Sequence, residues 1–156
     1  MNGTTANRIV GRFEFRLTAE IKVVRNSDDS VYVTRPQSRY FDASKARLHR
    51  YGEGEFCRFR MSGLPEAEGV YCLFSDGNLR YVGETIDLRQ RWYGYGHISP
   101  RNCYDGGRQT NCRVNKLILH EVRKGVTLTL WFLCTTRRKE VEAELRQRLQ
   151  PPWNRV

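Results

Sequence analysis

One carboxylate on the last predicted helix is well placed for metal chemistry. The apolar stripe of that helix consists of Val141, Leu145 and Leu149. At about 100° per residue, Glu142 lies about 60° from the centre of the stripe, Glu144 about 100° and Glu140 about 140°. Glu142 therefore leans onto the buried face, where a carboxylate costs free energy unless it is paired or binds a cation. A metal ligand and an ion pair with Arg146 or another arginine both stay open.

A guanidinium and three phenols form a second group that could do chemistry. Arg91 flanks the apolar face of a short predicted helix, and Tyr95 follows one turn later. The segment before this helix offers Tyr71 and Tyr81. A half-buried guanidinium beside phenols is suited to hold a phosphate. Each tyrosine can equally be a core or edge aromatic whose hydroxyl bonds the backbone, and spacing alone does not decide.

Strands and helices that position these residues follow from local patterns. GVYCLFSDGNLRYVGE predicts a hairpin, because two apolar runs flank Asp76-Gly77-Asn78, which tolerates positive φ. Asp87 is placed to cap the following helix, which is expected to end at Gly94 or Gly96. VTLTLWFL predicts a buried strand, and TTRRKEVEAELRQRLQ predicts a helix that Pro151-Pro152 terminates.

The remaining segments predict a β-rich start and an inserted helix. RFEFRLTAEIKVV and VYVT, separated by NSDDS, indicate a hairpin, and FCRFRM indicates a strand. Asp42 or Ser44 could cap a short basic helix that ends before Gly52. Thr110 could cap the helix NCRVNKLILHEVRKG, with Gly125 at the C′ position.

The order of these elements predicts an α/β fold. It has a small, mostly antiparallel central sheet flanked by helices and a β-rich N-terminal extension. We expect residues 1–62 to form that extension and residues 63–156 to form the core, with an inserted loop and helix at about 96–116.

Composition favours a polyanion as partner. The 27 Lys and Arg against 17 Asp and Glu give a formal charge of +10 and a pI near 9.7, although a merely solvated basic surface gives the same numbers. No apolar run is long enough for a membrane span or a signal peptide, so a cytoplasmic protein is expected. The five cysteines include no CxxC pair, and Cys103 and Cys112 with His97 and His120 match no metal-ligand pattern well.

Two short strings resemble the motifs of a nuclease superfamily. Gly69-Val70-Tyr71 and Tyr81-Val82-Gly83 are similar to the GIY and YIG elements that name the GIY-YIG nucleases. YVGETIDLRQRW resembles the family's second strand and arginine helix, which puts Arg91 at the catalytic arginine and Tyr95 where members carry Tyr or His.

The resemblance continues to the end of the chain. EAELRQRLQPPWN is similar to the family's metal-binding helix and closing asparagine, which implies Glu142 as metal ligand and Asn154 as the asparagine. The helical-face argument selects the same glutamate. The match covers residues 69 to 154, and about 60 N-terminal residues lie outside it.

What the resemblance implies is phosphodiester hydrolysis by in-line attack of water, aided by one divalent cation. Glu142 would hold Mg²⁺, with Mn²⁺ as a substitute, and Arg91 would brace a non-bridging oxygen. Tyr81 or Tyr71 would orient the attacking water and accept its proton, and His97 is the competing base.

The regions around the shared core are expected to contact double-stranded DNA. An N-terminal extension with an inserted loop resembles the type II restriction branch, for which a homodimer would suit a two-fold site. Nicking, repair and homing endonucleases, and a binding protein without catalysis, are the alternatives. The expected DNA contacts are Arg39, Lys45, Arg47, Arg89, Arg108, Gln109, Asn111, Arg113 and Asn115.

Overall fold

The computed structural model describes residues 6–39 and 47–155. In chain order its elements are β1 (Asn7–Val10), β2 (Phe13–Glu20), β3 (Val33–Thr34), the 3-10 helix η1 (Pro36–Arg39), β4 (Phe56–Cys57), β5 (Gly69–Ser75), β6 (Asn78–Thr85), α1 (Leu88–Gly96), the 3-10 helix η2 (Pro100–Cys103), α2 (Gln109–Arg123), β7 (Leu128–Cys134) and α3 (Arg138–Leu149). The expected basic helix capped by Asp42 or Ser44 falls largely outside the described residues. None of the described helices is both long and apolar enough to cross a lipid bilayer.

Two compact units divide the chain. The first unit comprises Met1–Ile21, Met61–Arg91 and Val126–Val156, and the second comprises Lys22–Arg60 and Trp92–Gly125. This division differs from the expected boundary after residue 62. The reason is that the first strands join the main sheet, whereas the rest of the N-terminal region packs with the inserted helix α2 through β4.

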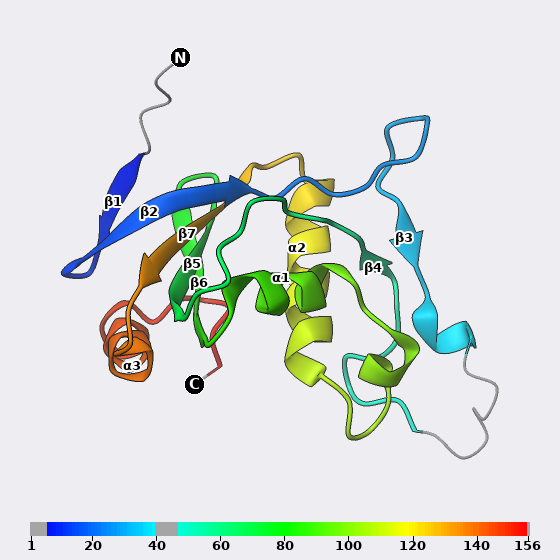
Figure 1. The fold of residues 1–156 in the computed structure, drawn as a ribbon. Coiled ribbons are helices and arrows are strands. Elements are labelled where there is room, and N and C mark those ends of the chain that lie inside the picture. The colour runs from blue at the N-terminus through cyan, green and yellow to red at the C-terminus, as the bar shows by residue number, and fades with distance from the viewer. Residues whose placement is uncertain (1–5, 40–46, 156) are drawn as a thin grey trace. The chain divides into compact units, whose positions relative to one another are not determined.

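The first unit contains a five-stranded sheet in the order β1-β2-β7-β5-β6, and every neighbouring pair is antiparallel (Figure 1). This confirms the expected mixed α/β fold around a mostly antiparallel sheet. The expected pairing of residues 12–24 with VYVT is wrong for most of its length. β2 pairs with β1 and β7 instead, and only a local turn remains, with a bridge between Arg25 and Val31.

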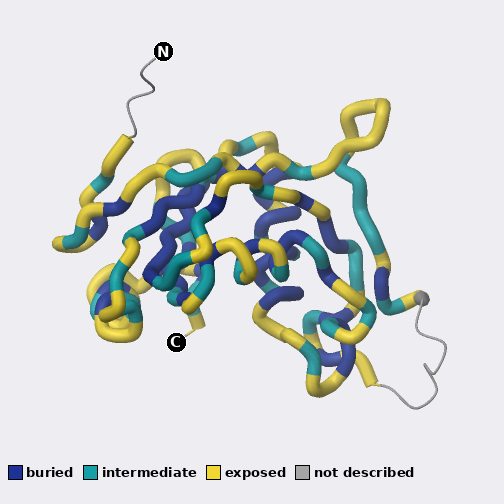
Figure 2. Tube along the Cα trace, viewed as in Figure 1, coloured by how far each residue is buried: buried dark blue, intermediate teal, exposed yellow. Residues whose placement is uncertain are grey.

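The hairpin of β5 and β6 forms as its sequence indicates. Asp76 and Gly77 take positive φ angles of 52° and 84°, as a tight hairpin turn requires. The register pairs Tyr71 with Gly83 and Leu73 with Tyr81, and an irregularity follows between Leu73 and Phe74. Figure 2 shows β5 buried along its whole length, as expected for a strand between β7 and β6.

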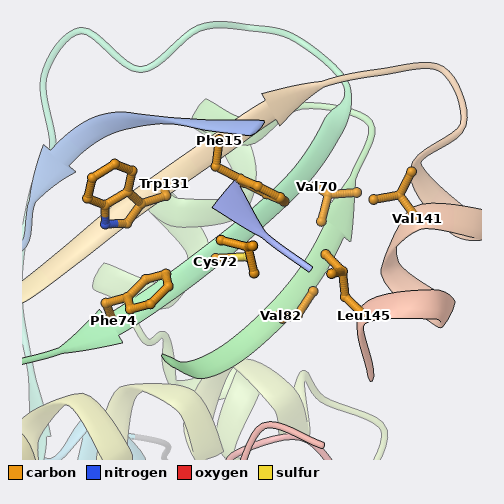
Figure 3. Packing of buried hydrophobic residues seen from close by; sticks show 9 residues of the cluster. Phe15, Val70, Cys72, Phe74, Val82, Trp131, Val141 and Leu145 are labelled. Atoms are coloured by element: carbon orange, nitrogen blue, oxygen red, sulfur yellow. The ribbon is translucent and has the colours of Figure 1, made fainter. Parts of the chain in front are cut away.

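Helix α3 packs on one face of this hairpin. Val70 and Val82 of the strands meet Val141 and Leu145 of the helix (Figure 3). The same cluster of buried residues continues through Phe15, Cys72, Phe74 and Trp131. Leu149, expected on the apolar stripe, is 41% exposed because the stripe ends where the helix does.

The second unit is organised around α2. Its buried cluster consists of Phe56, Ile98, Cys103, Tyr104 and Cys112. The helix begins at Gln109 without a side-chain cap, so the expected capping by Thr110 is wrong. Gly125 has the expected positive φ of 78° just after the helix end. All five cysteines are free thiols.

Truncating the buried leucine of α3 tests how strongly this packing holds the first unit. Leu145→Ala should lower the free energy of unfolding by about 2–5 kcal/mol, because Leu145 is fully buried and its removal leaves a cavity. Leu149→Ala is the matched control and should change stability by less than about 1 kcal/mol, because that side chain is largely in water. Urea unfolding followed by circular dichroism measures both, and equal losses would contradict the packing described.

Candidate active site

Two tyrosines lie on the hairpin face opposite α3. Side chains alternate along a strand, and the register therefore places Tyr71 and Tyr81 on one face, diagonal to each other. Their ring centroids are 6.2 Å apart. Tyr71 lies across Gly83, where an added Cβ would stand 2.4 Å from the tyrosine hydroxyl oxygen. The glycine is thus required for this placement of the phenol.

Arg91 joins these tyrosines through the start of α1. The backbone amide of Gln90 donates to the Asp87 side chain at 3.1 Å, which confirms Asp87 as the N-cap. One turn into the helix, the Nε atom of Arg91 donates to the hydroxyl oxygen of Tyr71 at 3.5 Å. The structure therefore brings Tyr71, Tyr81 and Arg91 together, as the sequence indicates. All three are buried or half-buried, which limits the water that screens their interactions.

Glu142 differs from the other two glutamates of α3. Its side chain is 17% exposed, and Arg146 donates to its Oε1 at 3.2 Å. Burial raises the pKa of the Glu142 carboxyl, and this effect outweighs the opposing charge and hydrogen bond of Arg146; the nearby Glu84 charge raises it further. Glu140 pairs with Arg137 on the exposed surface. The ion pair left open by the sequence is therefore present, yet it does not fully compensate the buried charge.

Glu144 shows the opposite behaviour. Arg12 donates to it through Nε at 2.9 Å and through Nη2 at 3.1 Å, and this two-point contact lowers the pKa of the Glu144 carboxyl. Glu142 is thus the glutamate of α3 on which burial dominates.

A groove of about 690 Å³ runs past Glu142. Arg146, Asn154 and Arg155 also line it. The Asn154 side chain accepts from the backbone amide of Val82 at 2.9 Å and donates to the carbonyl of the same residue at 2.8 Å. Asn154 thus holds the edge of β6 beside Tyr81, and both ends of its amide are engaged there. This arrangement makes Asn154 a positioning residue of the hairpin.

The donor set at Glu142 fits Mg²⁺, which binds through one or two carboxylates and keeps several waters. Glu84, the other carboxylate that acts on Glu142, is paired with Arg138, which also contacts Glu68 at 3.2 Å. No cluster of three or more His, Cys, Asp or Glu side chains occurs within residues 6–39 and 47–155. Glu142 would therefore be the protein's main ligand, with Arg146 displaced from its carboxylate.

Two of the expected site residues are core residues of the second unit. Tyr95 is fully buried and its ring meets that of Trp92 edge-on, with centroids 4.9 Å apart, so its expected catalytic role stays a prediction. Asn115 is also fully buried. Its amide bonds the backbone amide and carbonyl of Cys57 and the carbonyl of Tyr95, at 2.9, 2.9 and 2.7 Å. This buried side chain is therefore not placed to make the expected contact with DNA.

His97 is accessible but already engaged on one side. Its Nδ1 lies 3.0 Å from the carbonyl of Tyr93, and because a carbonyl only accepts, Nδ1 carries the proton. Nε2 is therefore the nitrogen that can accept a proton from solvent or substrate. Its ring also stacks on Tyr93, with centroids 4.1 Å apart. The sequence offered no signal for this pairing.

The remaining expected DNA contacts differ in accessibility. Arg89 is engaged, since it donates to the Leu64 carbonyl at 2.8 Å and to Glu66 at 2.6 Å. Asn111 is 7% exposed, which leaves little of it for DNA. Four of the expected contacts are exposed or half-buried and so can reach DNA: Arg47, Arg108, Gln109 and Arg113. Lys45 and the side chain of Arg39 lie outside the described part of the chain.

The pKa of Glu142 is raised and that of Glu144 is lowered, so the two residues should change the stability of the fold in opposite ways as the pH varies. A carboxyl whose pKa is raised on folding stabilises the fold below its unfolded pKa and loses that contribution as the pH rises through the folded value. Glu142→Gln should therefore be more stable than the unaltered protein at pH 7, and the difference should vanish below about pH 4.

Glu144→Gln is the matched control with the opposite sign. Because Arg12 lowers the pKa of Glu144, its stabilisation is present at neutral pH and is lost as the pH falls through the folded pKa. Glu144→Gln should therefore be less stable than the unaltered protein at pH 7. Thermal melts of both variants between pH 3 and 8 make the comparison. A loss of stability in Glu142→Gln at pH 7 would contradict the burial effect.

Comparison with known proteins gives a fold and no family. No family model matches the chain. A stretch of 93 residues, 54% of this chain, is 26% identical to the mouse disintegrin and metalloproteinase domain-containing protein 11, and the chain spans only 12% of that protein's length. The structure of a point mutant of bacteriophage T4 EndoII is similar with a TM-score of 0.50 and 17% identity, over 70% of this chain and 87% of that one. This similarity shows that the chain shares the EndoII fold.

Proposed function

We propose that the protein is a metal-dependent endonuclease that hydrolyses DNA phosphodiester bonds. The observation that carries the proposal is the contact of Arg91 with Tyr71, beside Tyr81, on a hairpin whose two strands carry the GVY and YVG strings. The fold shared with T4 EndoII supports an endonuclease, and the net charge of +10 suits a nucleic-acid substrate.

Each site residue has a chemical role in this proposal. The Arg91 guanidinium would bind a non-bridging phosphate oxygen and meet the charge that grows in the transition state. Glu142 would hold Mg²⁺, or Mn²⁺ in its place; when bound, the cation neutralises charge on the phosphate and stabilises the leaving oxygen. Asn154 would keep β6, and with it Tyr81, in place beside the groove.

Burial distinguishes the two tyrosines that could act as the base. Tyr71 is 1% exposed and its hydroxyl accepts from Arg91, so it is suited to orient the guanidinium. Tyr81, at 7%, retains somewhat more exposure and lies on the same face. We therefore place Tyr81 before Tyr71 as the group that accepts a proton from the attacking water, with His97 as the competing base.

Within the superfamily, the sequence pattern favours a site-specific type II restriction enzyme acting as a homodimer. The second unit, built from Lys22–Arg60 and Trp92–Gly125, would supply the sequence reading. A GIY-YIG nicking, repair or homing endonuclease is the second candidate, since those enzymes use the same chemistry. Discrete fragments from a plasmid with Mg²⁺ favour restriction, and nicks favour the second candidate.

Removing the charge of Glu142 tests the metal site. Glu142→Gln should lower Mg²⁺-dependent plasmid cleavage by at least about 100-fold, because the amide cannot replace the carboxylate as a ligand. Glu140→Gln makes the same change on the same helix at an exposed carboxyl and should cleave normally.

Thermal melts give a second readout of the same site. Mg²⁺ at millimolar concentration should raise the melting temperature of the unaltered protein and leave that of Glu142→Gln unchanged. Equal cleavage by the Glu142→Gln and Glu140→Gln variants would remove Glu142 from the mechanism.

Replacing a phenol by a phenyl ring tests the proposed base. Tyr81→Phe keeps the ring but removes the hydroxyl and should lower the cleavage rate by about 100- to 10,000-fold, the range of general base catalysis. Tyr51→Phe, a tyrosine of the second unit that packs on its buried cluster, is the control and should retain activity. Circular dichroism checks that both variants fold. If Tyr81→Phe cleaves at the normal rate, His97 becomes the leading base.

A further inference from the structure

The second unit contains a groove whose lining shares His97 with the residues of the catalytic proposal and otherwise lies outside it. It has a volume of about 610 Å³ and is formed by three segments, residues 32–38, Arg58 and residues 93–100. Five of its residues carry the argument: Tyr32, Arg35, Arg58, Tyr93 and His97. All belong to the second unit, so the groove is defined within that unit alone.

The groove is positively charged. Arg35 and Arg58 line it, and none of its lining residues is acidic. Arg35 is paired with Glu55, but Glu55 also pairs with Arg123, so one carboxylate faces two guanidinium groups. Arg58 is exposed, pairs with no carboxylate in the described part of the chain, and lies 5.9 Å from the ring centroid of Tyr32. This arrangement suits an anion, because it leaves uncompensated positive charge beside an aromatic ring.

Two stacked rings occupy another part of the groove lining. The rings of Tyr93 and His97 are 4.1 Å apart with an interplanar angle of 13°, and Tyr93 is 58% exposed. The hydrogen bond from His97 Nδ1 to the Tyr93 carbonyl fixes the histidine ring in this stack. A flat, exposed and already ordered aromatic pair loses little conformational entropy when a further ring stacks on it.

We propose that this groove binds an unstacked nucleotide of DNA, with its base stacked on the pair of Tyr93 and His97 and its phosphate held by Arg58. Cationic side chains beside exposed aromatic rings are the combination by which proteins bind unpaired nucleotides. The DNA substrate comes from the proposed function, which this inference deepens by naming a nucleotide-recognition site. The site takes a base that is extrahelical or single-stranded, because a base within a paired duplex has no free face.

A fluorescent base reports the stacking directly. Three DNA probes each carry one 2-aminopurine: a single strand, a duplex with the probe base unpaired, and a fully paired duplex. Binding is measured in EDTA, so that cleavage does not interfere. The unaltered protein should quench the probe in the first two DNAs and bind both more tightly than the paired duplex.

Stacking on an aromatic side chain contributes about 1–3 kcal/mol per base, so Tyr93→Ala should weaken binding about 5- to 150-fold and abolish quenching. Tyr93→Phe keeps the ring and should behave normally.

Arg58→Ala tests the phosphate contact. For single-stranded DNA, the slope of log K against log salt concentration should become shallower by about 0.7, the value for one phosphate contact on a single strand. Arg60→Ala removes the same charge at an exposed position that does not line the groove, and should leave the quenching unchanged.

The outcomes separate this inference from the nuclease proposal. Quenching that needs Tyr93, in a protein that cuts no DNA, supports the groove and refutes the nuclease. Cleavage by a protein whose probe is not quenched, or whose quenching survives Tyr93→Ala, refutes the groove and leaves the nuclease standing. Equal affinity for the three DNAs without quenching means that only the backbone is bound, and this also overturns the inference.

Discussion

The phenol of Tyr71 lies across the backbone of Gly83, and this close approach constrains the rest of the candidate site. A Cβ at residue 83 would stand 2.3 Å from the ring carbon that carries the hydroxyl, so any other residue would push the ring away. The position of the ring in turn sets where its hydroxyl meets Arg91 at 3.5 Å. The pairing register of β5 with β6 decides which residue lies opposite Tyr71. The register therefore also sets where the guanidinium of Arg91 can meet the Tyr71 hydroxyl.

A second constraint is the cost of a half-buried carboxylate on α3. Burial raises the pKa of Glu142, and the single ion pair with Arg146 does not cancel that effect. Arg146 also donates to the carbonyl of Arg155 at 2.6 Å, so it keeps a partner if a cation takes its place on Glu142. Such local destabilisation is common where a protein binds ligands, since the fold retains a charge that only the ligand compensates.

Local patterns in the sequence were sufficient for the hairpin, for α1 with its cap at Asp87, and for β7 and α3. Each is specified by neighbours along the chain: turn residues, a cap, or a run of apolar residues. Helix geometry identified Glu142 as the most buried of the three glutamates on α3, because the three differ in their angle to Val141 and Leu145.

The features that the sequence did not predict depend on contacts between residues far apart in the chain. The pairing of β2 with β7 joins segments more than 100 residues apart, and no local signal selects that partner over VYVT. Asn115 reads as a surface residue, yet it is buried because the backbone of Cys57 and Tyr95 satisfies its amide. Leu149 was misplaced for a related reason, since a helical pattern alone does not show where the neighbouring element ends.

The position of β7 in the sheet bears on how the protein is made. β7 spans Leu128–Cys134 and lies between β2 and β5, so these earlier strands have no neighbour on that side until residues 128–134 have been synthesised. Until then the apolar face of β2 and one edge of β5 are exposed to other molecules. During synthesis these surfaces therefore stay uncovered for longer than in a protein whose sheet closes in sequence order.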